Sequence, residues 1–213
     1  MGWFRLEPAG KKVGTPEDDT PYKPAALAKL KSERPAQAGT SPTFDTTDPR
    51  INYCDPIGLP RIYAVPNLFK FVQTPDTVYM LFEYGTVGLQ IGLNREHPED
   101  PDPTWWGDST GRYEGDTLVI DTVGFNDKTW LDHAARPHSD ELHLVQRFRR
   151  VDHNTLQLDV TFDDPKDYTR PWTGRKTFKL SQRDFVEHSC SMSENEHFRK
   201  AIMAPAINKP SGK

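Results

Sequence analysis

The chain has 213 residues, of which 27 are Lys or Arg and 31 are Asp or Glu, so its formal net charge is −4. This balance gives no electrostatic basis for binding nucleic acid or an anionic membrane surface. The sequence has no apolar run of about 18 residues, so we expect no transmembrane helix. A chain of this length favours one domain with a substantial core.

The N-terminal segment, residues 1–50, is rich in proline, threonine and aspartate and shows little hydrophobic periodicity. We expect an extended proline-rich arm with one short helix at residues 24–31, where Pro24 takes the first helical position. The β-barrel domain that we predict spans residues 51–191, and residues 192–213 form a tail. Docking of the arm on a second copy would give a homo-oligomer.

Beyond residue 61 the sequence has the pattern of β-strands. Short segments rich in β-branched and aromatic residues alternate with turn residues such as Pro75-Asp76 and Gly115-Asp116. Sequential strands without intervening helices indicate an antiparallel meander, which loses its edges by closing into an up-and-down barrel. We therefore predict a mostly β, lipocalin-like antiparallel barrel, with a sandwich as the alternative. The predicted strands are residues 69–73, 77–84, 87–93, 111–114, 117–123, 142–151, 156–162, 175–180 and 185–189.

Alternation along these strands gives several of them one apolar face and one mixed face. The mixed faces carry Glu83, Asp121, His143 and Arg147. In a barrel one face lines the lumen, and aromatic walls with a few charges are typical of a small-molecule pocket. We therefore assign these four residues to a ligand pocket, in which Asp121 would pair with Arg147.

Residues 104–147 hold three of the five tryptophans and three of the seven histidines, so we expect the active site there. Trp106 and Trp130 would form the walls of a pocket for a flat or carbohydrate-like ligand. The alternative is that these rings pack against the end of the barrel.

His138 lies in a loop between two predicted strands, close to several acids. Histidine titrates near neutral pH, so a loop histidine at a barrel mouth can act as a general acid or base. We expect His138 to transfer protons, with Asp127 orienting its ring. The alternative is a turn histidine bonded to the backbone.

A metal site is a weaker interpretation of the same histidines. His133, His138 and His143 recur every five residues, with Glu141 between the last two. Imidazole nitrogens and a carboxylate suit zinc or another divalent ion. Because this is not a recognised ligand spacing, we expect no cofactor and keep a divalent metal as the alternative.

Together these features favour a cofactor-independent acid/base enzyme. It would be a lyase, isomerase or hydrolase acting on a small aromatic or sugar-like molecule in the barrel lumen. One alternative is a non-catalytic barrel that binds a similar small-molecule ligand. The other is an assembly subunit that uses its N-terminal arm.

The stretch W-G-D-S-T-G-R-Y-E-G-D-T-L-V-I-D-T at residues 106–122 resembles an uncharacterised family of exported bacterial proteins from acidobacteria and soil bacteria. The likeness continues through G-F-N-D at 124–127 and P-H-S at 137–139, and it spans roughly residues 53–190. It implies a mature periplasmic or extracellular chain, since the sequence opens without a signal peptide. The shorter element G-R-Y-E-G at 111–115 is similar to turns of lipocalin-like barrels.

The two cysteines, Cys54 and Cys190, lie near the two ends of the predicted barrel domain. A disulfide between them would join these ends, and two buried free thiols are the alternative. The export implied by the resemblance favours the disulfide.

Overall fold

The computed structural model describes residues 19–33, 48, 50, 53–65, 67–86, 88–132, 134–186, 191 and 196. These residues form a mostly β structure that includes an α-helix and two short 3₁₀ turns. In chain order the elements are α1 (Pro24–Glu33), η1 (Arg61–Ala64), β1 (Phe69–Gln73), β2 (Thr77–Phe82), η2 (Tyr84–Thr86), β3 (Gly88–Leu93), β4 (Asp108–Glu114), β5 (Thr117–Val123), β6 (His143–Asp152), β7 (Thr155–Asp163) and β8 (Trp172–Lys179).

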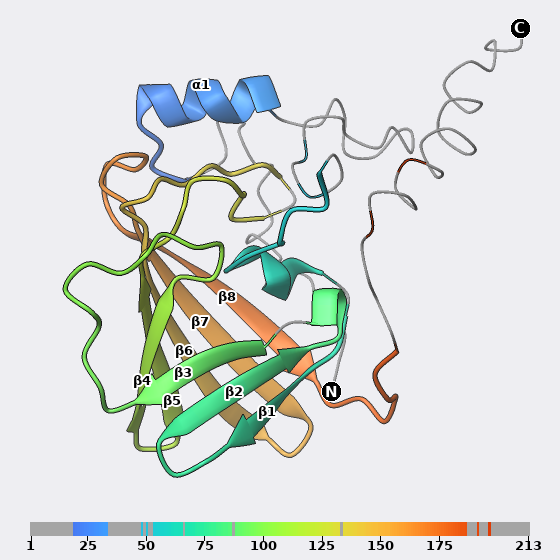
Figure 1. The fold of residues 1–213 in the computed structure, drawn as a ribbon. Helices are drawn as coiled ribbons and strands as arrows, with labels where there is room; N and C mark the ends of the chain where they lie inside the picture. Colours follow the sequence, from blue (N-terminus) through green and yellow to red (C-terminus); the bar gives the residue numbers. More distant parts are fainter. Residues whose placement is uncertain are drawn as a thin grey trace, which may run out of the picture.

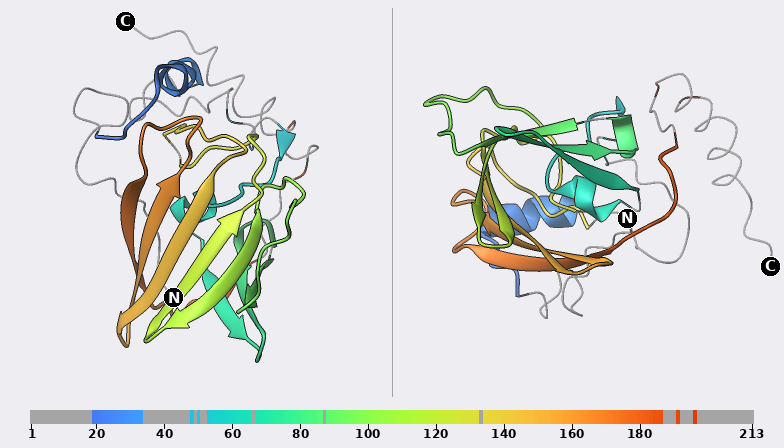
Figure 2. Two further views of the ribbon diagram at one scale, coloured as in Figure 1. Left: turned by 90° about the vertical axis from the view of Figure 1, so that its left-hand side faces the viewer. Right: turned by 90° about the horizontal axis from the view of Figure 1, so that it is seen from below.

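All eight strands belong to one sheet, in the order β1 to β8, which curls into a half-barrel (Figure 1, Figure 2). Seven of the predicted strands and the predicted helix overlap the observed elements closely, and the eighth, 111–114, covers the second half of β4. Every neighbouring pair is antiparallel except β3 and β4, which run parallel. The expectation of a purely antiparallel meander is therefore wrong, and the sheet is mixed.

The parallel pair follows from a long connection. Residues 94–107 carry the chain back along β3 before β4 begins, and they extend to one side of the sheet (Figure 1). A parallel pair needs such a crossover, whereas an antiparallel pair needs only a tight turn. Residue Thr104 in this connection forms an isolated bridge with Phe125, just after β5.

The inner face of the sheet is filled with apolar side chains that pack around η1. Tyr63 of η1 is 1% exposed. Its ring contacts four phenylalanines from different strands, namely Phe69, Phe82, Phe148 and Phe178. Three of these contacts are edge-on and the contact with Phe82 is tilted, and aromatic contacts of this kind add to the hydrophobic gain of burial. The concave side of the half-barrel is thus a packed core.

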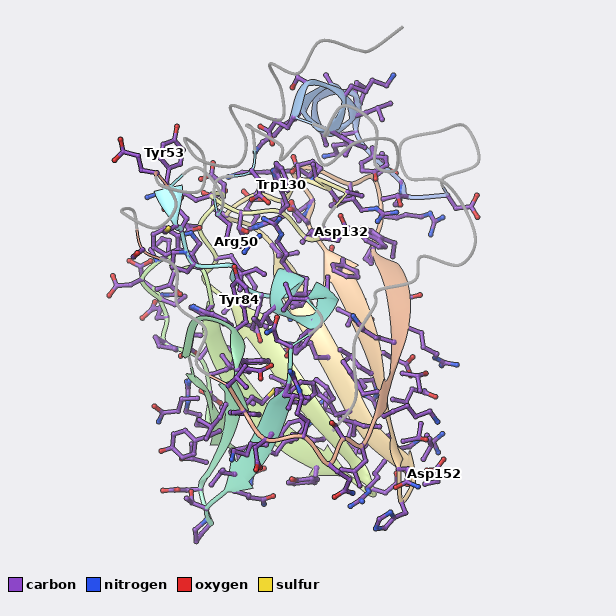
Figure 3. All side chains as sticks on the ribbon, turned by 90° about the vertical axis from the view of Figure 1, so that its right-hand side faces the viewer. Arg50, Tyr53, Tyr84, Trp130, Asp132 and Asp152 are labelled. Atoms are coloured by element: carbon purple, nitrogen blue, oxygen red, sulfur yellow. The ribbon has the colours of Figure 1, made fainter. Side chains whose placement is uncertain are left out.

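A layer of loops covers one end of the sheet, and α1 lies on that layer (Figure 1). Leu30 of α1 packs with Trp130 and Ala135 in a small second core. Trp130 and Asp132 lie in this layer, whereas Asp152 lies at the opposite tip of the sheet (Figure 3). No helix in the described part of the chain is long and apolar enough to span a membrane.

Residues 181–186 continue from β8 without strand structure and reach the start of the sheet. Arg183 and the backbone N–H of Val186 both bond the carboxylate of Glu83, at 2.9 and 3.0 Å. The predicted strand 185–189 is not found at residues 185–186, and residues 187–189 lie outside the described residues. Cys190 also lies outside them, so its pairing with Cys54 stays a prediction.

Two glycines with positive φ test how tightly the start of β4 is packed. Gly107 has φ +66, and a Cβ there would lie 2.6 Å from the Val123 carbonyl oxygen, whereas Gly115 has φ +61 and open space. Left-handed backbone alone costs about 1 kcal/mol for alanine. Gly115→Ala should therefore lower the free energy of unfolding by about that much, and Gly107→Ala by at least about 1 kcal/mol more. Urea unfolding of both variants measures the difference, and equal losses would contradict the close packing.

Candidate functional site

A cleft opens in the sheet where β3 and β4 diverge. The two strands pair only from Ile91 with Ser109 to Leu93 with Gly111. Next to this short pairing lies a cavity of about 400 Å³. It is lined by Gly88, Leu89, Gln90, Gly92, Arg95, Trp106, Gly107, Asp108 and Ser109.

Arg95 lies across the outer side of this cleft. A Cβ at Gly92 would be 2.3 Å from Arg95 Nε, so the glycine leaves room for the side chain. The guanidinium donates to both carboxylate oxygens of Asp108, at 3.0 and 2.6 Å, and to the carbonyl of Ser109 at 3.1 Å. A two-pronged pair of this kind fixes the orientation of the Asp108 carboxylate as well as its charge.

From Asp108 a chain of hydrogen bonds leads away from the cleft over the outer face of the sheet. His97 Nδ1 lies 2.6 Å from Asp108 Oδ1, and His97 Nε2 lies 3.0 Å from Asp121 Oδ1. His143 Nε2 lies 2.9 and 3.0 Å from the two oxygens of Asp121. One imidazole therefore bridges two carboxylates, and it can donate to both only when both of its nitrogens carry hydrogen.

Strand register explains why these groups meet. Asp108 pairs with Val123, and Asp121 pairs with Thr110 and with Val145, so their side chains share the outer face. His97 reaches them from the crossover, residues 94–107. The side chains of His97, Asp108 and Asp121 are 22%, 24% and 27% exposed, and His143 is 41% exposed. The chain thus runs from the cleft to solvent.

The electrostatics of the chain follow from these contacts. The hydrogen bond with Asp121 raises the pKa of His143, and the same bond lowers the pKa of Asp121. For Asp108, partial burial acts to raise the pKa, but hydrogen bonds from Arg95 and His97 outweigh it, so the net shift is downward. Both carboxylates are held in their charged forms by the groups that donate to them.

A second hydrogen-bonded chain runs from the cleft into the core, on the inner face of the sheet. Ser109 Oγ lies 2.9 Å from Thr122 Oγ1, which accepts from Gln146 Nε2 at 3.2 Å. The Tyr63 hydroxyl donates to Gln146 Oε1 at 2.6 Å. All four residues are buried. Polar groups this deep need such partners, because an unpaired one costs about 1–3 kcal/mol.

Of the pocket residues predicted from the sequence, Trp106 lines the cleft, and Asp121 and His143 belong to the outer chain. The expectation that the mixed strand faces line a lumen is wrong, since these faces lie outside. Asp121 does not pair with Arg147, because Arg147 bonds Glu114 at 2.6 Å. Glu83 instead ties residues 181–186 to the sheet.

His138 is placed differently from the mouth position expected for it. It is 1% exposed, and its Nδ1 bonds the Ser139 carbonyl at 3.0 Å, as the alternative interpretation had it. Burial lowers its pKa, which keeps the ring neutral. Asp127 makes no hydrogen bond to this ring in the described part of the chain, so the proposed orienting role is not supported by contact.

Trp130 and the described residues of the alternative metal site also lie away from the cleft. Trp130 packs in the loop layer, where its Nε1 donates to Glu33 at 3.0 Å. For the metal alternative, His133 lies outside the described residues. Among the described residues, no group of three or more His, Cys, Asp or Glu side chains is arranged to hold a metal ion, and Glu141 pairs with Lys166 at 3.2 Å.

Three members of the outer chain were missed by sequence reasoning, namely Arg95, His97 and Asp108. Arg95 and His97 lie in a proline-rich stretch without periodicity, where nothing predicts which strands they approach. Asp108 follows Gly107, so it resembles a turn residue although it begins β4. A histidine and an arginine in a long connection could have indicated Arg95 and His97, because long loops often carry functional residues.

No family model matches this chain, and no curated protein or solved structure is similar enough to it to indicate a relationship. Its function is therefore inferred from the geometry described above.

The Asp121–His143 pair predicts a pH-dependent stability. Because the pKa of His143 is raised above 6.5, its contribution is complete below pH 6.5 and is lost as pH rises through the raised value. Because the pKa of Asp121 is lowered below 3.8, its contribution is complete above pH 3.8 and is lost as pH falls through the lowered value. His143→Gln should therefore lower the free energy of unfolding most at pH values between the lowered pKa of Asp121 and the raised pKa of His143. The loss should be less than about 1 kcal/mol, because the pair is half-exposed.

Urea unfolding at pH 5.5 and pH 9 measures this effect. His153→Gln, which alters an exposed histidine at the β6–β7 turn, is the matched control. A His143→Gln penalty that is larger at pH 9 than at pH 5.5 would contradict the pairing.

Proposed function

We propose that the cleft between β3 and β4 binds a small molecule and that the protein is a cofactor-independent acid/base enzyme. One observation carries the proposal: His97 bridges Asp108, which lines the cleft, and Asp121, which is bonded to the more exposed His143. Four titratable groups in one hydrogen-bonded line, beside a cavity, are the arrangement that proton transfer needs.

In this proposal Asp108 exchanges the proton with the ligand. When His97 carries its hydrogen on Nε2 alone, the Asp108 carboxylate accepts a proton from the ligand and passes it to the free Nδ1 of His97, as Nε2 gives its proton to Asp121. Asp121 passes this proton to the free Nε2 of a neutral His143, and the other ring nitrogen of His143 releases its proton to water. One proton enters at the cleft and one leaves at the surface. Arg95 keeps Asp108 charged at rest and holds it in place.

The lining of the cleft favours a small, flat ligand without net charge. Trp106 supplies an aromatic wall and also packs against Phe82, with ring centroids 5.9 Å apart. The charges of Arg95 and Asp108 cancel each other. An aromatic or sugar-like compound suits such a wall. The reaction types that fit are isomerisation and elimination, since both begin with proton removal.

This location differs from the lumen of a lipocalin-like barrel. A lipocalin-like relationship, export and the disulfide all stay predictions, and so does oligomer formation through the N-terminal arm. None of these predictions concerns the residues of the cleft, so the proposed chemistry does not depend on them.

Deuterium incorporation tests the proposed function without a known substrate. The protein is incubated with a bacterial metabolite extract in D₂O, and mass spectrometry finds compounds that gain deuterium or change mass. We expect wild-type protein to label at least one compound. His97→Asn and Asp108→Asn should each lower the rate by about 10²–10⁴-fold, as is typical for loss of a general acid or base.

Arg175→Gln is the control, because it breaks the outer-face ion pair with Asp159 without touching the cleft chain. It should label at the wild-type rate. Labelling that survives both His97→Asn and Asp108→Asn would contradict the proposal. An unlabelled compound that copurifies with the protein would favour the non-catalytic binding barrel instead.

A further inference from the structure

The proton transfer proposed above does not use the inner chain of hydrogen bonds. Its four members, Tyr63, Gln146, Thr122 and Ser109, are at most 2% exposed, so water does not satisfy them. Only Ser109 lines the cleft. A row of four polar side chains through an aromatic core costs desolvation that apolar residues would avoid. The desolvation cost of this row indicates that its polar side chains have a chemical role.

The hydrogen bonds of this row leave one hydroxyl hydrogen without an acceptor among the described residues. Tyr63 donates to Gln146 Oε1, and Gln146 Nε2 donates to Thr122 Oγ1. One hydroxyl hydrogen lies between Thr122 and Ser109, and the second hydroxyl hydrogen has no acceptor within the described residues. If the second hydrogen belonged to Thr122, which is 0% exposed, it would be buried and unpaired. If Thr122 donates to Ser109, the spare hydrogen is on Ser109, at the cleft.

We infer that the ligand of the cleft is a carbonyl compound whose oxygen accepts a hydrogen bond from the Ser109 hydroxyl. This inference rests on the proposed function, because it takes the cleft as the ligand site. An acceptor at Ser109 completes the row Tyr63 to Gln146 to Thr122 to Ser109 to ligand. Each donor in such a row polarises the next, so the last one is a stronger donor than an isolated serine.

The two chains then act on the same compound from the two faces of the sheet. Asp108 and Ser109 are consecutive, so their side chains point to opposite faces, and both line the gap between β3 and β4. Asp108 removes the proton on the carbon next to the carbonyl, and the C–H electron pair moves into the carbonyl to form an enolate. The Ser109 hydroxyl stabilises the charge that develops on oxygen. Return of a proton to a different carbon of a conjugated enolate, or to the other face of the same carbon, completes an isomerisation without loss of atoms.

Matched pairs of probes test the inference. The ketones cyclohexanone, 1-indanone and 1-tetralone are each compared with the hydrocarbon that lacks the oxygen, and binding to the full chain is followed by tryptophan fluorescence and NMR titration. At least one ketone should bind about tenfold more tightly than its hydrocarbon, the value of one well-placed hydrogen bond. Ser109→Ala should reduce this ratio to about one.

Tyr63→Phe is the second variant, since it keeps Ser109 but removes the first donor of the row. It should lower the ratio by about two- to threefold, and it serves alone if Ser109→Ala does not fold. A ratio near one in the wild type, absence of binding by every ketone, or a ratio that both variants preserve would overturn the inference.

Deuterium exchange at the carbon next to the carbonyl separates this inference from the proposed function. Exchange that Asp108→Asn abolishes supports both. A ketone preference that depends on Ser109, without any exchange in wild-type protein, supports the carbonyl site and contradicts the acid/base enzyme.

Discussion

The parallel pairing of β3 with β4 is the constraint on which the rest of the site depends. It holds over three residue pairs only, and it forces the chain to return through residues 94–107. The short overlap leaves the cleft beside it. The return path places Arg95 and His97 over the outer face of β4 and β5, where Asp108 and Asp121 receive them. An antiparallel hairpin at this point would create neither feature.

Strand alternation divides the cleft between two kinds of chemistry. On β5, Asp121 points outward to His97 and His143, while its neighbour Thr122 points inward to Gln146 and Ser109. The outer groups are ionisable side chains in partial contact with solvent, so they can exchange protons. The inner groups are neutral and buried, so they can only donate and accept hydrogen bonds. Two neighbouring positions on one strand thus support proton transfer on one side and recognition of a ligand oxygen on the other.

The fold was largely predictable from the sequence, because inward-facing apolar residues recur with period two and turn residues separate the strands. Residues 69–73 and 117–123 were predicted with the observed bounds of β1 and β5. The direction of β4 was not predictable, since nothing local in residues 94–107 specifies where the chain returns. The mixed strand faces were predicted to line the interior, but they lie outside. The apolar faces take the inside, because they pack against Tyr63.

The same reasoning explains which site residues could be found. Trp106, Asp121 and His143 lie in or beside regular strands, so pattern analysis reached them. His97 and Arg95 depend on the path of the crossover, and Asp108 depends on the strand that follows Gly107. His138 attracted attention as a loop histidine, but burial against Phe125 and its bond to the Ser139 carbonyl give it a place in the packing.

The central claim is that His97 bridges Asp108 and Asp121 at the edge of the cleft. Nitrogen-15 NMR of the histidine rings tests it most directly, because the two ring nitrogens give separate signals. The account predicts that Asp108→Asn shifts mainly the Nδ1 signal of His97 and that Asp121→Asn shifts mainly its Nε2 signal. Two His97 signals that neither substitution moves, as expected for a ring free in solvent, would contradict the account.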